Sequence, residues 1–351
     1  MSPQDRRSRP SESESPSASI TPVNGSSIVS NLLNPPVLFF VLGMAATLVR
    51  SDLRIPSAVQ KILSLYLMWA IGVRGGVELS HGDLSIGIAV WLGAGMLFSL
   101  TAPVLVFAIM RRWLGVDTAA ALGASYGSVS AVTFITAGAY LQSSGIAFGG
   151  YMVALLALME SPAIVSAVLL HRMASREGGG ELRGGALARE LLREALVNGP
   201  VFLLLGSMVI GYATSARSAE LHPFTHDIFP GMLSFFLLDM GLVASQRIRD
   251  SRALRGMRGV GLALFGVGWA AIVGSAGAIA AWMLGMSEGD GVLFAVLCGS
   301  ASYIAAPAAM RMTIPRADAG VYLPLALAVT FPFNVMLGIP LFHAVYRWIS
   351  A

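Results

Sequence analysis

Two short segments of small residues, Gly127-Ser128-Val129-Ser130 and Gly299-Ser300-Ala301-Ser302, repeat one pattern in the two halves of the chain. Each segment lies inside a long apolar run, and the two runs hold the same place within their halves. Glycine and serine in such runs ordinarily serve close helix packing. Two segments at matching positions, the second followed by Pro307, instead favour a pair of interrupted helices at a functional site.

The composition excludes most other classes of protein. Only 12% of the 351 residues are charged and 55% are hydrophobic, whereas a soluble domain carries about 25% charged residues. Cys298 is the only cysteine, which excludes a disulfide scaffold within the chain. The basic residues form short clusters between apolar runs, which argues against nucleic acid as a partner. No pairing of a nucleophile with a base is evident, so we do not expect an enzyme.

What remains is an all-α polytopic membrane protein. From Pro36 onward, apolar runs of about 17–25 residues, long enough to cross a bilayer, alternate with short charged breaks. We therefore predict ten transmembrane helices, at residues 36–50, 57–73, 85–110, 118–140, 148–171, 199–215, 228–246, 260–285, 290–310 and 321–348.

The chain divides into four parts on this prediction. Residues 1–27 are rich in Ser and Pro with nothing to bury, so we predict a disordered N-terminal tail. Residues 28–171 and 199–351 each hold five predicted spans, and residues 172–198 form a linker between them.

The distribution of basic residues predicts the orientation. If the N-terminus lies outside, 17 Lys and Arg residues fall in cytoplasmic breaks and six fall outside, three of them in the tail. This bias matches the positive-inside rule. We therefore expect both termini on the extracytoplasmic side and the linker in the cytoplasm.

Other matching segments indicate an internal repeat. Leu33-Asn34-Pro35-Pro36-Val37 opens the first span and Val197-Asn198-Gly199-Pro200-Val201 opens the sixth. Ala70-Ile71-Gly72-Val73 in the second span parallels Asp239-Met240-Gly241-Leu242 in the seventh. Because five is odd, equivalent spans must run in opposite directions. This is the inverted-topology repeat of many secondary transporters, whose sites lie near the membrane midplane at broken helices.

The paired segments have the chemistry of an anion site. If spans four and nine each break at the glycine, each following half-helix presents about +0.5 charge and free N–H groups at its N-terminus. Two such ends suit a small monovalent oxyanion, whereas phosphate or sulfate more often recruits a guanidinium group, and neither span contains a basic residue. We predict an anion site formed by Gly127, Ser128, Val129, Ser130, Gly299, Ser300, Ala301 and Ser302.

Few acidic residues lie at membrane depth, and such residues are functional-site candidates by default. Glu160 lies in span five, and the counterpart region of span ten contains Thr330, Pro332 and Asn334. A carboxylate with hydroxyl and amide oxygens suits sodium, and proton coupling through Glu160 is the rival interpretation. Asp239 in span seven is equally consistent with a functional carboxylate and with a structural partner at a helix end.

Three strings of residues resemble the cyanobacterial-type sodium-dependent bicarbonate transporter family (SbtA). They are Leu237-Leu238-Asp239-Met240-Gly241-Leu242, then Gly299-Ser300-Ala301-Ser302-Tyr303-Ile304-Ala305, then Phe333-Asn334-Val335 with Gly338-Ile339-Pro340. The resemblance extends from about residue 31 to the C-terminus. It implies five plus five inverted spans, in which spans one, two, six and seven form a gate and the others a core. It also implies a homotrimer, symport of Na⁺ with HCO₃⁻, and a small PII-like regulatory protein on the cytoplasmic face.

The family's site residues carry over by position. Gly127, Ser128, Ser130, Gly299, Ser300 and Ser302 would frame the anion, and Glu160, Thr330 and Asn334 would hold sodium. A known member of the family has aspartate at the position of Glu160, alanine at Ser128 and a Thr-Lys pair at Trp69-Ala70, so the present chain departs from it there.

We therefore expect a sodium-coupled bicarbonate symporter of a bacterial plasma membrane that works by alternating access. The alternatives are a proton- or sodium-coupled carrier of another small anion and a membrane receptor that binds the anion without moving it. No cofactor is expected beyond Na⁺ as the coupling ion.

Overall fold

The computed structural model describes residues 33–81, 85–175 and 199–351, and all regular secondary structure in these ranges is helical. The predicted tail, residues 1–27, lies outside the described residues, as does the predicted linker beyond Ser175. The prediction of an all-α protein is therefore confirmed for the described part of the chain.

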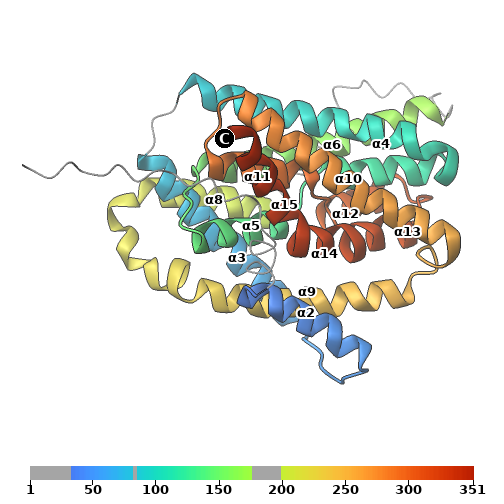
Figure 1. The fold of residues 1–351 in the computed structure, drawn as a ribbon, viewed down its shortest axis with the longest axis horizontal. Helices are drawn as coiled ribbons and strands as arrows, with labels where there is room; N and C mark the ends of the chain where they lie inside the picture. Colours follow the sequence, from blue (N-terminus) through green and yellow to red (C-terminus); the bar gives the residue numbers. More distant parts are fainter. Residues whose placement is uncertain (1–32, 82–84, 176–198) are drawn as a thin grey trace, which may run out of the picture.

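The described residues of the first half form five helices, which Figure 1 shows in blue to green: α2 (Pro35–Leu48), α3 (Ser57–His81), α4 (Ile86–Gly127), α5 (Ala131–Ser143) and α6 (Tyr151–Ala174). The long helix α4 is bent at Gly115, whose φ of 75° lies in the left-handed region that glycine adopts without steric cost. This bend separates the third predicted span from the fourth.

The second half begins with α8 (Gly199–Ala213), η1 (Ser215–Glu220), η2 (Pro223–Asp227) and α9 (Phe229–Asp250). It continues with α10 (Gly256–Met283), α11 (Glu288–Gly299) and α12 (Ala305–Thr313).

The last helical stretch, Ala319–Ser350, changes its helical form along its length. It comprises α13 (Ala319–Pro324), η3 (Leu325–Thr330), α14 (Phe331–Phe333), η4 (Asn334–Gly338) and α15 (Ile339–Ser350), and both η3 and η4 are π-helical. Pro324, Pro332 and Pro340 interrupt the regular hydrogen-bond ladder because proline has no N–H group. Such wide turns are frequent at functional sites.

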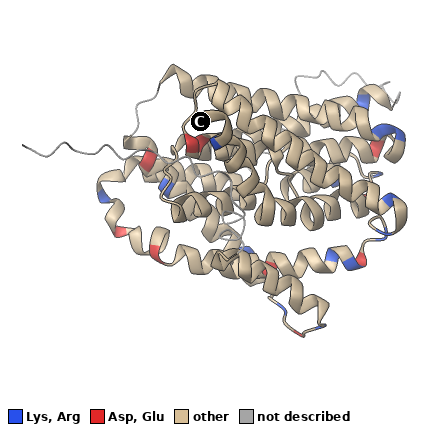
Figure 2. Cartoon of the chain, in the orientation of Figure 1, with Lys and Arg blue, Asp and Glu red and all other residues tan. Residues whose placement is uncertain are grey.

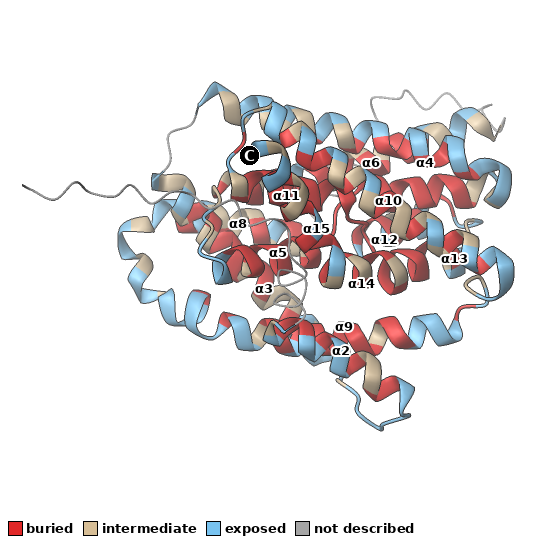
Figure 3. Cartoon of the chain, viewed as in Figure 1, coloured by how far each residue is buried: buried red, intermediate tan, exposed pale blue. Residues whose placement is uncertain are grey.

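The surface of the bundle is that of a membrane protein. Among the described residues, six helical stretches are long and apolar enough to cross a membrane, and α2 and α8 are shorter apolar helices. Charged residues gather at the two ends of the long helices and leave the middle almost free of charge (Figure 2). Leu97, Leu105 and Ile109 of α4 are large apolar residues that are exposed, and Figure 3 shows exposed residues along α4. These features indicate a multi-pass membrane protein.

Two helix crossings depend on glycine. Helix α2 packs against α9, and α3 packs against α8. A Cβ atom on Gly241 would overlap the carbonyl oxygen of Phe40, and one on Gly72 would overlap the carbonyl oxygen of Leu204. Backbones approach this closely in membrane bundles only where small residues permit it.

We predict that Gly241→Ala lowers the midpoint of thermal unfolding of the detergent-solubilised protein, because the added methyl group forces α2 and α9 apart. Overpacking of this kind costs about 1–3 kcal/mol. The matched control is Gly268→Ala in α10, where an added Cβ meets no atom within 4 Å. That change should leave stability unaltered or raise it by up to about 1 kcal/mol through helix propensity. Equal midpoints for the two variants would contradict the assigned crossing.

Candidate functional site

The segments Gly127-Ser128-Val129-Ser130 and Gly299-Ser300-Ala301-Ser302 each interrupt a helix. Helix α4 ends at Gly127 and α5 begins at Ala131, while α11 ends at Gly299 and α12 begins at Ala305. The first residue past each helix has nearly the same backbone geometry, with φ −85° and ψ 174° at Ser128 and φ −87° and ψ 171° at Ser300. The chain therefore leaves the two helices with the same backbone geometry, although α12 begins further from its interruption than α5 does.

Gly127 and Gly299 do not themselves break the helices, contrary to the prediction from the sequence pattern. Neither Gly127 nor Gly299 has a positive φ, so the chain leaves the helix at the following serine rather than at the glycine. A Cβ on Gly127 would lie 2.5 Å from the Pro103 ring, and one on Gly299 would lie 2.9 Å from the Ala270 carbonyl oxygen. These glycines allow close packing of the interrupted helices against their neighbours.

Pro307 lies in the first turn of α12, where a helix tolerates proline. It is the third residue of α12. An N–H group at this position has no partner inside the helix, so its absence costs no helical hydrogen bond.

The two interruptions are joined by hydrogen bonds. The N–H of Ser130 donates to Oγ of Ser300 over 3.0 Å. The N–H of Ser302 donates to the carbonyl oxygen of Ser125 over 2.8 Å. The two segments, far apart in sequence, thus meet at one place inside the protein, where all four of these serines are buried.

Serine hydroxyls cap the helices that follow. Oγ of Ser130 accepts from the N–H of Thr133 over 3.2 Å at the start of α5. Oγ of Ser302 accepts from the N–H of Ala306 over 3.2 Å at the start of α12. Each cap satisfies one of the donors that a helix start leaves without a partner.

Other donors at the same place stay unpaired. The backbone N–H groups of Val129, Val132, Ala301 and Ala305 donate no hydrogen bond to another described residue, although all four residues are buried. Buried backbone donors without a partner are rare, and helix N-termini favour anions. No Lys or Arg lies between residues 118 and 143 or between 288 and 310. The arrangement can therefore hold a small anion with backbone N–H groups and helix dipoles.

Two of the predicted sodium ligands reach the interruptions. The hydroxyl of Tyr126, next to Gly127, lies 2.6 Å from Oγ1 of Thr330. Nδ2 of Asn334 donates to the carbonyl oxygen of Gly299 over 2.9 Å. One turn of the Ala319–Ser350 helix thus contacts both interruptions. Oδ1 of Asn334 is buried without a hydrogen-bond partner in the described structure, which leaves one oxygen available to a cation.

Glu160 lies at the first interruption only. Its carbonyl oxygen accepts from Oγ of Ser128 over 3.1 Å. Its half-buried carboxylate forms no hydrogen bond or ion pair with another described residue, so the structure does not join it to Thr330 or Asn334.

Two further polar residues at this place are not predicted by the sequence pattern. Ser125 Oγ and Thr133 Oγ1 are buried without a partner in the described part of the chain. The signal available in the sequence was their spacing, because Ser125 and Thr133 lie within one helical turn of Gly127-Ser128-Val129-Ser130.

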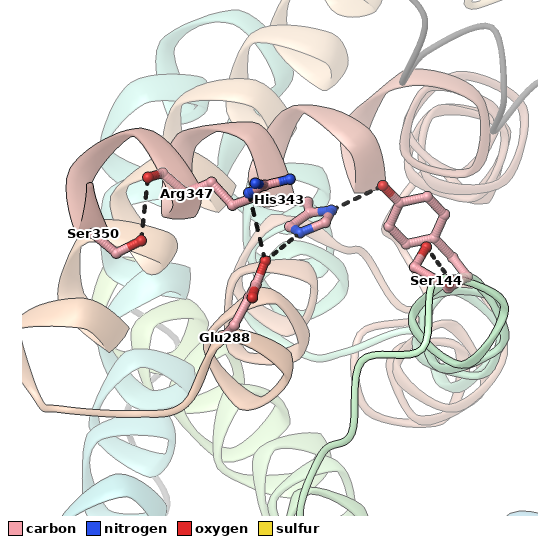
Figure 4. A network of polar contacts seen from close by, with 6 residues as sticks. Ser144, Glu288, His343, Arg347 and Ser350 are labelled. Carbon is pink, nitrogen blue, oxygen red and sulfur yellow. Dashed lines mark hydrogen bonds and ion pairs between the residues drawn. The ribbon is translucent and has the colours of Figure 1, made fainter. Parts of the chain in front are cut away.

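A separate polar network ties three helices at one end of the bundle (Figure 4). His343 in α15 contacts the Tyr140 hydroxyl through Nδ1 at 2.9 Å and the Glu288 carboxylate through Nε2 at 2.7 Å. Nε of Arg347 lies 3.8 Å from the same carboxylate. Because Tyr140 belongs to α5 and Glu288 to α11, this network fixes the two interrupted helices to α15.

A cavity of about 650 Å³ lies away from the interruptions. It is lined by residues of α3, of the chain from the end of α5 to the start of α6, and of the chain from η1 to η2, including Arg74, Gln142, Phe148 and His222. None of the predicted site residues lines it. We therefore place the candidate site at the meeting of the two interruptions rather than in this cavity.

Comparison with known proteins gives one clear match. The sequence model of the Na⁺-dependent bicarbonate transporter superfamily matches residues 35–347, which include every predicted site residue. A search of curated proteins gave no match.

We predict that Ser300→Ala destabilises the protein, because the buried N–H of Ser130 loses its acceptor. An unsatisfied buried donor costs about 1–3 kcal/mol. The midpoint of thermal unfolding should fall, and the segment around Ser130 should lose protection from hydrogen exchange. The control is Ser143→Ala, at an exposed position whose hydroxyl bonds only within its own helix turn and whose loss should change stability by less than about 0.5 kcal/mol. Unchanged exchange near Ser130 in Ser300→Ala would refute the cross-link.

Proposed function

The chain belongs to the Na⁺-dependent bicarbonate transporter superfamily, and on that premise we propose that it imports bicarbonate across a bacterial plasma membrane by sodium-coupled symport. The family is one of transporters rather than enzymes. The observation that carries the proposal is the meeting of two interrupted helices that have unpaired backbone N–H groups and contain no Lys or Arg near the interruptions.

The five-plus-five inverted repeat is part of the proposal, and the helix crossings support it. Gly72 and Gly241 are matching positions of the two halves, and so are Leu204 and Phe40 when the Asn-x-Pro segments are aligned. Gly72 packs against the carbonyl oxygen of Leu204, and Gly241 packs against that of Phe40. Equivalent residues thus make equivalent contacts, as an inverted repeat requires.

We propose that α2, α3, α8 and α9 form the gate and that the remaining helices form the core. Pairing of α2 with α9 and of α3 with α8 supports a gate built from both halves. Both interruptions lie in the core, so an anion held there would move with it. Movement of the core past the gate would expose the anion to each side of the membrane in turn.

Charge and size explain why bicarbonate fits. Two helix N-termini of about +0.5 each offset one negative charge. Unpaired N–H groups from both segments can each donate to an oxygen of the anion. Of the predicted anion residues, Val129 and Ala301 supply such donors, Ser130 and Ser302 cap the following helices, and Gly127 and Gly299 allow the close packing. Ser300 joins the two interruptions, and Ser128 bonds the Glu160 carbonyl oxygen.

For sodium we propose Glu160, Thr330 and Asn334 as ligands. The unpaired Oδ1 of Asn334 and the unpaired carboxylate of Glu160 are the oxygen donors that support this assignment, and irregular helix segments hold Na⁺ in other secondary transporters. Sodium here would neutralise the carboxylate before the anion binds next to it, which makes binding of the two ions mutually favourable.

The energetics depend on how many sodium ions accompany each anion. With one Na⁺ per HCO₃⁻, each tenfold sodium gradient supplies about 1.4 kcal/mol, or tenfold accumulation, and voltage contributes nothing. A second sodium adds the voltage contribution of about 2.3 kcal/mol per 100 mV.

Assembly and regulation rest on the family resemblance alone. We propose a homotrimer, a PII-like regulatory protein on the cytoplasmic face, and extracytoplasmic termini. The orientation is supported by the excess of basic residues in the predicted cytoplasmic breaks.

We predict that purified protein in proteoliposomes accumulates labelled bicarbonate under an inward sodium gradient and stops doing so when potassium replaces sodium. Uptake that ignores sodium but follows a proton gradient would instead support the proton-coupled carrier. Binding without accumulation would support the receptor. Accumulation of a different small anion in preference to bicarbonate would redirect the substrate assignment.

We further predict that Ser130→Ala and Ser302→Ala each raise the half-saturating bicarbonate concentration about tenfold, the effect of about 1.4 kcal/mol in binding. Ser130→Thr retains both hydroxyl and cap and should recover most of the affinity.

Glu160→Gln should instead raise the half-saturating sodium concentration, and Ser143→Ala should change neither the sodium nor the bicarbonate dependence. An unaltered sodium dependence in Glu160→Gln would remove that residue from the cation site.

A further inference from the structure

Asp239 is a buried carboxylate that the chain satisfies only in part. It lies in the middle of α9 and is 1% exposed. Oδ1 accepts a hydrogen bond from Nε2 of Gln60 over 2.6 Å. Oδ2 has no hydrogen-bond partner among the described residues, and no ion pair is formed with Asp239 in that part of the chain.

Neither protonation state suits this environment without another ligand. An ionised carboxylate out of water needs a compensating charge. A protonated one would place an O–H at Oδ2 that has no acceptor there, and an unmet hydrogen bond is itself costly. A monovalent cation at Oδ2 would satisfy both requirements.

Asp290 shows how the same protein treats a structural carboxylate. It is 5% exposed, close to the burial of Asp239. Its Oδ1 accepts from the N–H of Gly149 over 2.7 Å, and its Oδ2 accepts from the hydroxyls of Tyr151 and Ser287. Both oxygens of Asp290 are therefore satisfied by the chain, whereas one oxygen of Asp239 is left open.

Asp239 also occupies a position that connects the gate with the candidate anion site. The hydroxyl of Tyr303, in the second interruption, lies 3.8 Å from Sδ of Met240, the residue that follows Asp239. Tyr303 thus brings the second interruption into contact with α9 at the residue next to the carboxylate.

We propose that Asp239 binds a second sodium ion at the contact between α9 and the second interruption, separate from the site proposed at Glu160. The proposal extends the symport proposed above, and its consequence is that two sodium ions accompany one bicarbonate. Each cycle then moves one net positive charge inward.

The test of binding is thermal unfolding of the solubilised protein in sodium chloride and in choline chloride at equal ionic strength. Each occupied site adds its own contribution to stability, so Asp239→Asn should lose about half of the sodium-specific shift and should be more stable than the wild type in choline. Asp290→Asn is the matched control and should lower the midpoint equally in both salts.

A second measurement does not depend on that variant folding. Glu160→Gln should retain a sodium-specific shift, because the Asp239 site remains. The proposal would be overturned if sodium did not shift the unfolding midpoint of Glu160→Gln, or if it shifted that of Asp239→Asn as much as that of the wild type. It would also be overturned if the midpoint changed with pH but not with sodium.

The transport readout separates this proposal from the symport itself. Wild-type uptake should rise when the inside of the vesicle is made electrically negative. Its dependence on sodium concentration should have a Hill coefficient of about two, as expected for two bound sodium ions. Sodium-dependent uptake that is indifferent to voltage would refute the second coupling ion and leave the symport intact. Uptake independent of sodium would refute the symport, and the unfolding test would still decide whether Asp239 binds the cation.

Discussion

The hydrogen bond from the N–H of Ser130 to Oγ of Ser300 is the contact on which the arrangement of this protein depends. In an apolar membrane every backbone polar group must find a partner inside the protein. Two helices that stop near the centre of the bundle therefore need a local substitute for the bonds they lack. Here each interruption supplies partners to the other, through Ser300 to Ser130 and through Ser125 to Ser302.

The remaining helices are shaped to keep these two interruptions together. Gly127 and Gly299 allow tight packing against neighbouring helices, and the wide turns of the Ala319–Ser350 stretch carry Thr330 and Asn334 to one interruption each. At the end of the bundle, His343 joins α5 to α11 through Tyr140 and Glu288. The donors left unpaired at the centre are then held in place, so that an anion meets a site already formed. Such preorganisation reduces the cost of binding.

Much of the architecture could be predicted because it follows from local chemistry. Apolar runs of membrane length and scarce charge predict a helical membrane protein, and the paired glycine-serine segments mark where helices are interrupted. The role of Gly127 and Gly299 could not be predicted in this way. Their backbone angles are ordinary, and the need for glycine arises only from Pro103 and Ala270, which lie in other helices.

The sequence by itself determined the fold class, the family and the residues of the two interruptions, because periodicity, composition and motif strings are properties of the chain alone. Only the tertiary structure decided which polar atoms remain without a partner. Asp239 and Asp290 are both acidic residues in apolar surroundings. Gly149 and Tyr151 from a distant segment and Ser287 from the adjoining turn satisfy Asp290, whereas Gln60 is the one hydrogen-bond donor to Asp239 among the described residues. Hydrogen-bond satisfaction is a property of the packed chain, and it is this property that distinguishes a structural carboxylate from a candidate cation site.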